Sequence, residues 1–407
     1  MNQIKNKKNG SFLYFFLFIF IIQPGVKDLM AQENKKSSKS HLPPKYAIGL
    51  LYENGTVFQT NTFVKGINKE MEPIKNYQAF SGRIIFQTTG EKYWQQIFGF
   101  PTWGFGLHIS DFYNPEEMGV PIALYVFLNA PFHSWNNLSF NYEIDFGLTA
   151  NWKKFNPVSN QYNVAIGAGE TVYIHVGAGL YYKFLKCWEA GAGIGLTHFS
   201  NGALKKPNFG LNTFSPRIEI KYNVSNQAKL KKQIIPAFHQ FNSLDITFFA
   251  GLKNVIYDSL KVNIKTRYKG VYFPVFGLSS TFSRQLTYKS KVGIGISFSY
   301  DGSVNARVSV EKGKLDIIDL PMMEQYRISI FPSYELTMGQ FSLLLQPGFY
   351  IFRKQFPKQV PISYQRIGLK YTFAKNITAG ISLRAYKFHI SDFIEWRIGY
   401  QINWNKN

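Results

Sequence analysis

From about Lys45 onward, apolar and polar residues alternate with a period of two, in runs separated by clusters of Gly, Pro, Asn, Asp and Lys. This region shows no convincing helical periodicity. The clearest run is FIEWRIGYQINW near the C-terminus, whose apolar row is Ile394, Trp396, Ile398, Tyr400, Ile402 and Trp404 and whose other row is Glu395, Arg397, Gly399, Gln401 and Asn403. Such a pattern predicts β-strands with one apolar and one polar face.

Alternating strands of about ten residues are typical of a transmembrane β-barrel, in which the apolar row faces lipid and the polar row faces the lumen. The composition agrees, because 45% hydrophobic and 17% aromatic residues supply a large apolar surface. A mean hydropathy of −0.15 excludes a bundle of membrane helices. We therefore predict an all-β, transmembrane antiparallel β-barrel of roughly 16 strands. Aromatic residues near strand ends, such as Tyr400 and Trp404, are expected at the membrane interface.

The number of barrels is a separate question. A polar stretch from Asn223 to Gln240 divides the alternating region into halves and fits either a long loop or a linker. We prefer a single barrel, with two smaller barrels in tandem as the alternative. A weak internal similarity, between GIGLTHFSNG at Gly193 and GIGISFSYDG at Gly293, fits either a duplication or chance.

The N-terminal segment has the features of a secretory signal peptide. Three lysines precede an apolar run from Phe12 to Ile22, which is too short to span a bilayer, and a small residue follows at Ala31. We predict a signal peptide over residues 1–31. The remaining chain is interpreted as a catalytic half, residues 32–225, and a second barrel half, residues 226–407, that could be a degenerate repeat.

The formal net charge of +22 calls for an anionic partner or a basic surface that aids solubility. Nucleic acid is not favoured, because the lysines and arginines are scattered singly along alternating strands without a recognition helix. Anionic lipid headgroups fit better. The single cysteine, Cys187, cannot form an internal disulfide and is interpreted as a packing residue.

The stretch GIGLTHFSNGALKKPNFGLN, beginning at Gly193, carries the candidate chemistry. Alternation places Ala190, Ala192, Ile194, Leu196, His198 and Ser200 on the apolar row, with Glu189, Gly191, Gly193, Gly195, Thr197 and Phe199 opposite. His198 and Ser200 are therefore expected to point out of the barrel, side by side, where an imidazole could take the proton of a hydroxyl. His175 falls on a polar row and is expected in the lumen. By itself, His-x-Ser is a weak signal.

The residues around this pair strengthen the signal. The segment HFSNGALKKPNFG resembles the signature of the lipid A 3-O-deacylase family (PagL-type, also labelled acyloxyacyl hydrolase), which are outer-membrane barrels. The matching positions are His198, Ser200, Asn201, Pro207, Asn208 and Gly210. The resemblance covers about Lys45 to Asn223. It implies Ser200 as nucleophile, His198 as general base and Asn208 as oxyanion donor, together with a backbone N–H near Gly202. At the family's glutamate position this chain has Asn212.

A second resemblance concerns the asparagine at position 212. Outer-membrane phospholipase A also has an outward-facing H-x-S-N-G followed by an asparagine, and Asn212 matches its spacing. In either case His198, Ser200 and Asn212 would be the catalytic set. The phospholipase resemblance would add calcium, for which the chain shows no definable ligand spacing. Lys205 and Lys206 either hold a lipid phosphate or belong to an ordinary basic loop, and Asn201 is a further candidate substrate contact.

We expect an outer-membrane serine acyl-ester hydrolase that acts on lipid A-like glycolipid and needs no cofactor. The alternatives are a phospholipase A and a non-enzymatic pore or structural barrel with a remnant site. No GxSxG elbow, nucleotide loop or zinc-spaced Cys/His set stands out. The expected partners are membrane lipids and not nucleic acid, and the sequence leaves a homodimer open.

Overall fold

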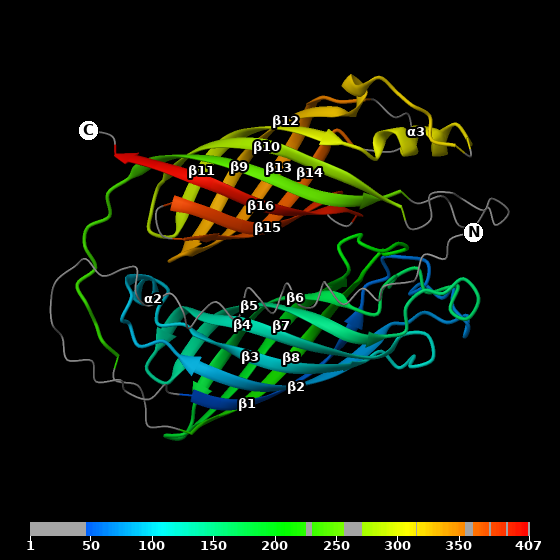
Figure 1. The fold of residues 1–407 in the computed structure, drawn as a ribbon. Coiled ribbons are helices and arrows are strands. Elements are labelled where there is room, and N and C mark those ends of the chain that lie inside the picture. The colour runs from blue at the N-terminus through cyan, green and yellow to red at the C-terminus, as the bar shows by residue number, and fades with distance from the viewer. Residues whose placement is uncertain are drawn as a thin grey trace, which may run out of the picture. The chain divides into compact units, whose positions relative to one another are not determined.

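The computed structural model describes residues 46–224, 230–255, 271–314, 316–354, 361–373, 376–387 and 390–405. In this part of the chain, sixteen antiparallel strands form two closed barrels of eight strands each (Figure 1). The predicted signal peptide, residues 1–31, lies outside the described residues. None of the helices among these residues is long and apolar enough to cross a membrane.

The first barrel contains the candidate site. Its strands are β1 (Tyr46–Val57), β2 (Asn76–Gln87), β3 (Thr102–Asp111), β4 (Gly119–Trp135), β5 (Leu138–Trp152), β6 (Thr171–Lys183), β7 (Trp188–Ser200) and β8 (Leu211–Asn223). Each strand pairs with the next, and β8 returns to pair with β1, for example at Ala47 and Asn223. A five-residue helix, α2 (Tyr93–Ile97), lies between β2 and β3.

The second barrel has the same organisation. Its strands are β9 (Phe241–Asn254), β10 (Tyr272–Gln285), β11 (Ser290–Asp301), β12 (Tyr326–Met338), β13 (Phe341–Phe352), β14 (Ser363–Thr372), β15 (Ile377–Tyr386) and β16 (Ile390–Asn405). Pairing of β16 with β9 closes it. Helix α3 (Val304–Glu311) and the 3-10 turn η1 (Met322–Gln325) lie between β11 and β12. Helices α2 and α3 and the turn η1 are in loops and are too short to produce a periodic sequence signal.

The predicted all-β fold and the strand number are confirmed, but the preference for a single barrel is wrong and the tandem alternative is correct. Alternation reveals which way a side chain faces, and this is the same in a barrel of eight strands as in one of sixteen. Closure depends instead on which strands pair. The similar segments at Gly193 and Gly293 fall on the seventh strand of the first barrel and the third strand of the second, so they are not equivalent positions.

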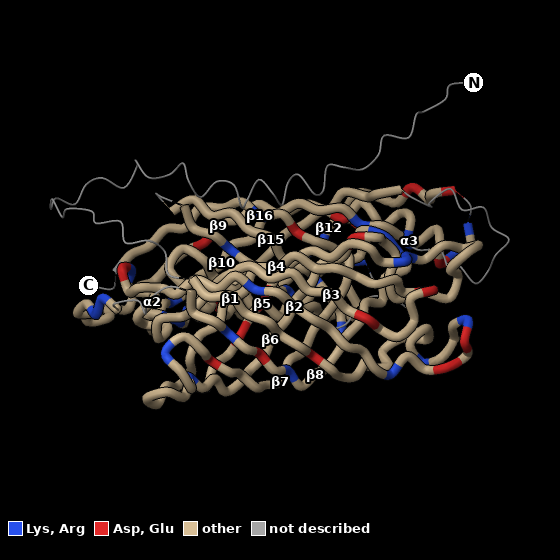
Figure 2. Tube along the Cα trace, turned by 90° about the horizontal axis from the view of Figure 1, so that it is seen from below, with Lys and Arg blue, Asp and Glu red and all other residues tan. Residues whose placement is uncertain are grey.

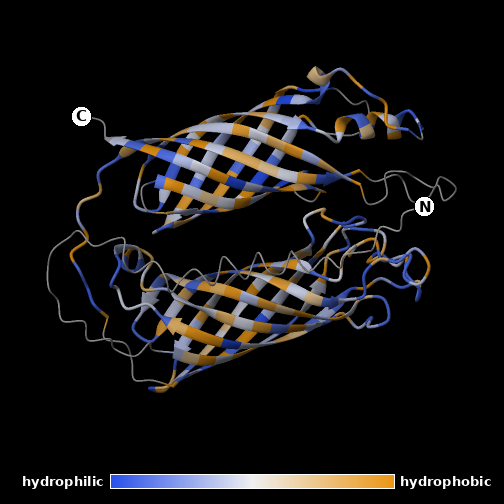
Figure 3. Cartoon of the chain, in the orientation of Figure 1, coloured by the Kyte–Doolittle hydropathy of each residue, from blue (hydrophilic) through white to orange (hydrophobic). Residues whose placement is uncertain are grey.

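The strands present apolar side chains outward and polar side chains to the lumen, as the alternation predicts. Figure 3 shows hydrophobic and hydrophilic residues along the strands of both barrels. On β16, Ile398 and Tyr400 are 58% and 50% exposed, whereas Glu395 is fully buried. The same division holds on β7, where Leu196 is exposed and Thr197 is buried. An outward apolar row on closed barrels is the arrangement that lipid requires.

Lys, Arg, Asp and Glu residues occur along the strands as well as in the loops (Figure 2). In the first barrel, charged side chains form ion pairs across the lumen. Glu143 on β5 accepts bonds from Arg83 on β2 at 2.9 Å and from Arg217 on β8 at 2.7 Å. Arg83 also contacts Glu219 at 3.0 Å. Each arginine is three strands away from Glu143 around the wall, so these ion pairs fill the bore instead of lining a channel.

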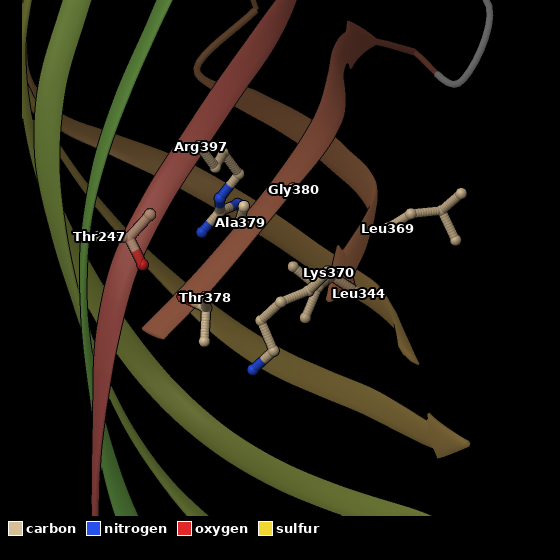
Figure 4. A pocket seen from close by; sticks show the side chains of 8 residues that line it. All are labelled: Thr247, Leu344, Leu369, Lys370, Thr378, Ala379, Gly380 and Arg397. Carbon is tan, nitrogen blue, oxygen red and sulfur yellow. The ribbon is translucent and has the colours of Figure 1, made fainter. Parts of the chain in front are cut away.

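The second lumen is also filled. Lys370 on β14 pairs with Glu335 on β12 at 2.7 Å and with Asp245 on β9 at 3.4 Å. Beside Lys370 and Arg397 lies a cavity of about 10 Å³ (Figure 4), which is room for at most one water molecule. Both barrels therefore have packed ionic interiors.

Loop lengths differ between the two ends of the first barrel. The loops after odd-numbered strands, 58–75, 112–118, 153–170 and 201–210, lie at one end because the strands are antiparallel. At the other end the connections are 88–101, which contains α2, and the short turns 136–137 and 184–187. The long loops are supported by buried apolar side chains, among them Phe63, Val64, Ile74, Phe112, Trp152, Ile166, Phe199 and Leu211.

Candidate active site

The His198 and Ser200 side chains belong to the last residues of β7, at the end of the barrel with the long loops. They continue the outward row of Ile194 and Leu196, which are 52% and 45% exposed, whereas Phe199 between them is fully buried. By register both side chains continue the outward row, as expected, but His198 is half-buried and Ser200 is only 4% exposed. His175, in contrast, is buried in the lumen and lies 2.8 Å from the hydroxyl of Thr197, again as expected.

Asn212 on β8 is the direct register partner of His198 on β7. Its Oδ1 lies 2.7 Å from Nδ1 of the imidazole. An amide oxygen can only accept, so Nδ1 must carry the proton in this contact. The other ring nitrogen, Nε2, is then unprotonated and can act as a base.

The Ser200 hydroxyl oxygen accepts two N–H groups. The side-chain amide of Asn208 donates to it at 2.9 Å and the backbone N–H of Gly202 at 3.1 Å. Within the described part of the chain, no hydrogen bond joins Ser200 to His198, but the hydroxyl proton of Ser200 is not used by either of these two contacts. Hydrogen bonds between catalytic groups are often long before substrate binds.

The loop 201–210 gives Asn208 a fixed orientation. Asn208 Oδ1 accepts the backbone N–H of Asn201 at 3.1 Å, which leaves its NH₂ group to face Ser200. The loop turns sharply at Gly202 and Ala203, where φ is +61° and +66°. A positive φ is unusual for alanine and is typical of functional loops.

The predicted substrate contacts have different environments. The side chain of Asn201 is turned toward its own loop, because its NH₂ group donates to the carbonyl of Lys205 at 2.7 Å. Lys205 is exposed, and Lys206 follows it before Pro207. The roles of Asn201, Lys205 and Lys206 toward substrate stay predictions.

Sequence analysis missed the residues that brace this loop from elsewhere. Asn61 donates to the carbonyl of Gly210 across 149 positions of sequence, and the carbonyl of Ala165 accepts the N–H of Gly210. A single sequence contains no signal for such contacts, since they are between loops and follow no period.

The lumen holds a group of metal-ligand residues, Glu143, Asp145 and His175, whose ligand atoms lie within 4.8 Å of one another. The oxygens of Glu143 are already bonded to Arg83, Arg217 and Asn129. Because two guanidinium groups surround this carboxylate, the group is better explained as part of the ionic interior than as a metal site.

A second histidine–serine pair lies in the lumen, and its members are in contact. His108 Nδ1 is 3.0 Å from the Ser81 hydroxyl and 3.6 Å from Glu53, so serine and carboxylate share one ring nitrogen. A catalytic triad needs them on opposite nitrogens. Of these two pairs, the outward one has the arrangement of a base and a nucleophile.

Two family models match the chain. The model described as lipid A 3-O-deacylase (PagL) matches residues 79–221, and the model described as acyloxyacyl hydrolase, C-terminal domain, matches residues 242–404. The first match contains every residue of the candidate site. The second match covers most of the second barrel. No curated protein matched the chain.

Three solved structures with similarity to this chain are distant in sequence. The crystal structure of the outer membrane enzyme PagL is 18% identical, with 42% of this chain and 97% of that chain covered and a TM-score of 0.27. The toluene transporter TodX of P. putida is 10% identical, with 89% and 91% covered and a TM-score of 0.17. CdiB from Escherichia coli is 10% identical, with 90% and 64% covered and a TM-score of 0.21.

The two family matches together account for most of both barrels. Residues 79–221 are therefore similar to the lipid A 3-O-deacylase (PagL) family, and residues 242–404 are similar to the acyloxyacyl hydrolase C-terminal domain.

Proposed function

We propose that this protein is an outer-membrane serine hydrolase that removes an ester-linked acyl chain from a lipid A-like glycolipid. The observation that carries the proposal is the position of Ser200, on the outward apolar row, with its hydroxyl oxygen bonded to two N–H donors and a histidine two residues away on the same face. A nucleophile on that face meets acyl esters that never leave the membrane.

The reaction would begin with attack of Ser200 Oγ on the ester carbonyl carbon while His198 Nε2 takes the hydroxyl proton. The carbonyl oxygen becomes an oxyanion beside Oγ, where the NH₂ group of Asn208 and the N–H of Gly202 are available to stabilise it. Collapse of this intermediate breaks the bond to the sugar oxygen, which receives the proton from the imidazolium. Water, deprotonated by His198, then releases the acyl group from Ser200 as a fatty acid.

Asn212 has a limited part in this mechanism. Its oxygen holds the proton on Nδ1 of His198 and so keeps Nε2 available as the base. Being neutral, it adds no charge to stabilise the imidazolium that forms when the proton is transferred. The mechanism therefore depends more strongly on the oxyanion donors than a triad with a carboxylate would.

The position of the site supports a substrate in the outer leaflet. In bacterial outer-membrane barrels the longer loops are extracellular and the short turns periplasmic, and the site lies at the end with the long loops. Lys205 is exposed in the loop that carries Asn208, within the same loop as Lys206. We propose that these lysines bind a phosphate of the glycolipid.

Two alternatives are less well supported. A phospholipase A would use the same serine and histidine, so substrate analysis must separate it from a deacylase. A passive pore is disfavoured because side chains from strands three apart around the wall meet inside both barrels, as the pairs Arg83–Glu143 and Lys370–Asp245 do.

The test is to incubate the purified protein in mixed micelles with lipid A or with phospholipid and to analyse both lipids by mass spectrometry. We expect lipid A to lose one ester-linked acyl chain and phospholipid to stay intact. Lysophospholipid without a change in lipid A would replace the deacylase with a phospholipase, and intact lipids in both samples would reject the hydrolase.

A further inference from the structure

Two loops that are remote in sequence hold the loop 201–210 in place. From the loop 58–75, the NH₂ group of Asn61 donates to the carbonyl of Gly210 at 3.1 Å. The same side chain accepts the N–H of Val64 through Oδ1 at 3.2 Å. Asn61 is buried, so both of its polar ends are satisfied within the protein, one in its own loop and one in the loop of the candidate site.

The loop 153–170 contacts the same segment from its own side. The carbonyl of Ala165 accepts the N–H of Gly210 at 3.0 Å, and the carbonyl of Val164 accepts the N–H of Phe209 at 3.2 Å. At Gly167 the two loops approach so closely that a Cβ would lie 2.1 Å from the carbonyl oxygen of Pro207. We call Asn61, Val164, Ala165 and Gly167 the loop clamp.

Gly210 is the point on which the loop clamp acts. It lies between Asn208 and Asn212 in sequence, has a φ of +70°, and has both its N–H and its carbonyl bonded to the clamp. A Cβ at Gly210 would lie 3.0 Å from Cε1 of His198. Any movement of Gly210 would therefore shift the oxyanion donor, the partner of the imidazole, or both.

We propose that Asn61 is a positioning residue of the active site, acting through Gly210 to hold Asn208 and Asn212 in register with Ser200 and His198. This inference rests on the proposed function. Asn61 does not touch the reacting atoms. It fixes one backbone carbonyl, and displacement of a catalytic group by about 1 Å is enough to lower a rate about 100-fold.

A purely structural role for Asn61 is the competing explanation, and Asn68 provides the matched control. Asn68 is also a buried asparagine of the loop 58–75. Its NH₂ group donates to the carbonyls of Phe63 and Glu72, and its Oδ1 accepts the N–H of Glu72, all within its own loop. Within the described part of the chain, its side chain makes no hydrogen bond to the loop 201–210, whereas the side chain of Asn61 does.

The sharpest variant is Asn61→Asp. The carboxylate keeps an oxygen for the N–H of Val64 but replaces the NH₂ donor with a second oxygen that faces the carbonyl of Gly210. We expect kcat for deacylation to fall about 10- to 100-fold with KM changed less than about twofold, whereas Asn68→Asp should leave kcat within about twofold. Gly167→Ala, which pushes on Pro207 from the other loop, should reproduce the loss of kcat while Asn61 is intact.

Hydrogen exchange measured by mass spectrometry provides a readout that does not need activity. Faster exchange of the peptide covering residues 201–212 in Asn61→Asp, and not in Asn68→Asp, is expected from the bonds to Gly210. Equal exchange of this peptide in both variants would overturn the inference, as would equal kcat values in an active enzyme. If the wild-type protein released no acyl chain, the proposed function would fail, and the exchange data would still decide whether Asn61 positions this loop.

Discussion

Oδ1 of Asn212 lies 2.7 Å from Nδ1 of His198, on directly paired positions of β8 and β7. The contact defines which imidazole nitrogen is the base, although Asn212 carries no charge. The third residue of a catalytic triad orients the histidine and stabilises its positive charge. Substitution of Asn212 can separate these two effects.

Asn212→Ala removes the oxygen that orients the imidazole, and we expect kcat to fall about 10³-fold because the wrong tautomer becomes accessible. Asn212→Asp keeps the shape and adds a negative charge beside Nδ1. We expect it to raise kcat up to about tenfold by stabilising the imidazolium. The measurement is the rate of acyl release under saturating substrate.

Asn223→Ala, at the opposite end of β8, is the control for loss of an asparagine from this strand. A kcat for Asn212→Asp below that of the wild type would show that charge at this position is harmful and that orientation alone is used.

Asn208→Asp tests the oxyanion donor. The aspartate can still accept the N–H of Asn201, but it presents an oxygen and not an NH₂ group to Ser200. We expect kcat to fall about 10²- to 10³-fold with little change in KM, because the lost bond is strongest in the transition state. An unchanged kcat would leave the backbone N–H of Gly202 as the main donor and remove Asn208 from the mechanism.

Removal of divalent metal should not affect the reaction. The groups proposed for attack, proton transfer and oxyanion stabilisation are Ser200, His198, Asn208 and a backbone N–H, none of which needs a metal. The rate of acyl release should be the same with excess EDTA and with millimolar calcium. A rate that disappears with EDTA and returns with calcium would favour the phospholipase resemblance instead.

Glu143→Gln tests the ionic interior of the first barrel. This change leaves Arg83 and Arg217 in the lumen without their shared carboxylate, and breaking a buried ion pair in this way costs about 3–5 kcal/mol. We expect a lower free energy of unfolding, measured by urea titration of the refolded protein in lipid vesicles. The exposed residue Glu116 is the control, since Glu116→Gln should change stability by less than about 0.5 kcal/mol. If Glu143→Gln and Glu116→Gln had equal free energies of unfolding, the ion pairs of Glu143 would not stabilise the first barrel.

Which side chains of a strand point outward could be predicted from the sequence, because a period of two is a local property. It placed His198 and Ser200 outside the barrel and His175 inside before any pairing was known. Asn208 and Asn212 were found through the resemblance of a short segment, and the structure brings both to the pair.

Long-range features could not be predicted in the same way. The closure of β8 on β1, which makes two barrels, depends on strand pairing that alternation does not encode. The contact of Asn61 with Gly210 joins two irregular loops, and the meeting of Arg83 and Glu143 depends on the diameter of the closed barrel. Each of these is set by three-dimensional closure and not by local pattern.

The most direct test of the central claim compares wild-type protein and Ser200→Ala in a mass-spectrometric assay of lipid A, with Ser139→Ala at the other end of the barrel as control. We predict that wild type and Ser139→Ala release one ester-linked acyl chain and that Ser200→Ala, folded as a barrel, releases none. Full acyl release by Ser200→Ala would contradict the account, because the nucleophile would then have to be another group.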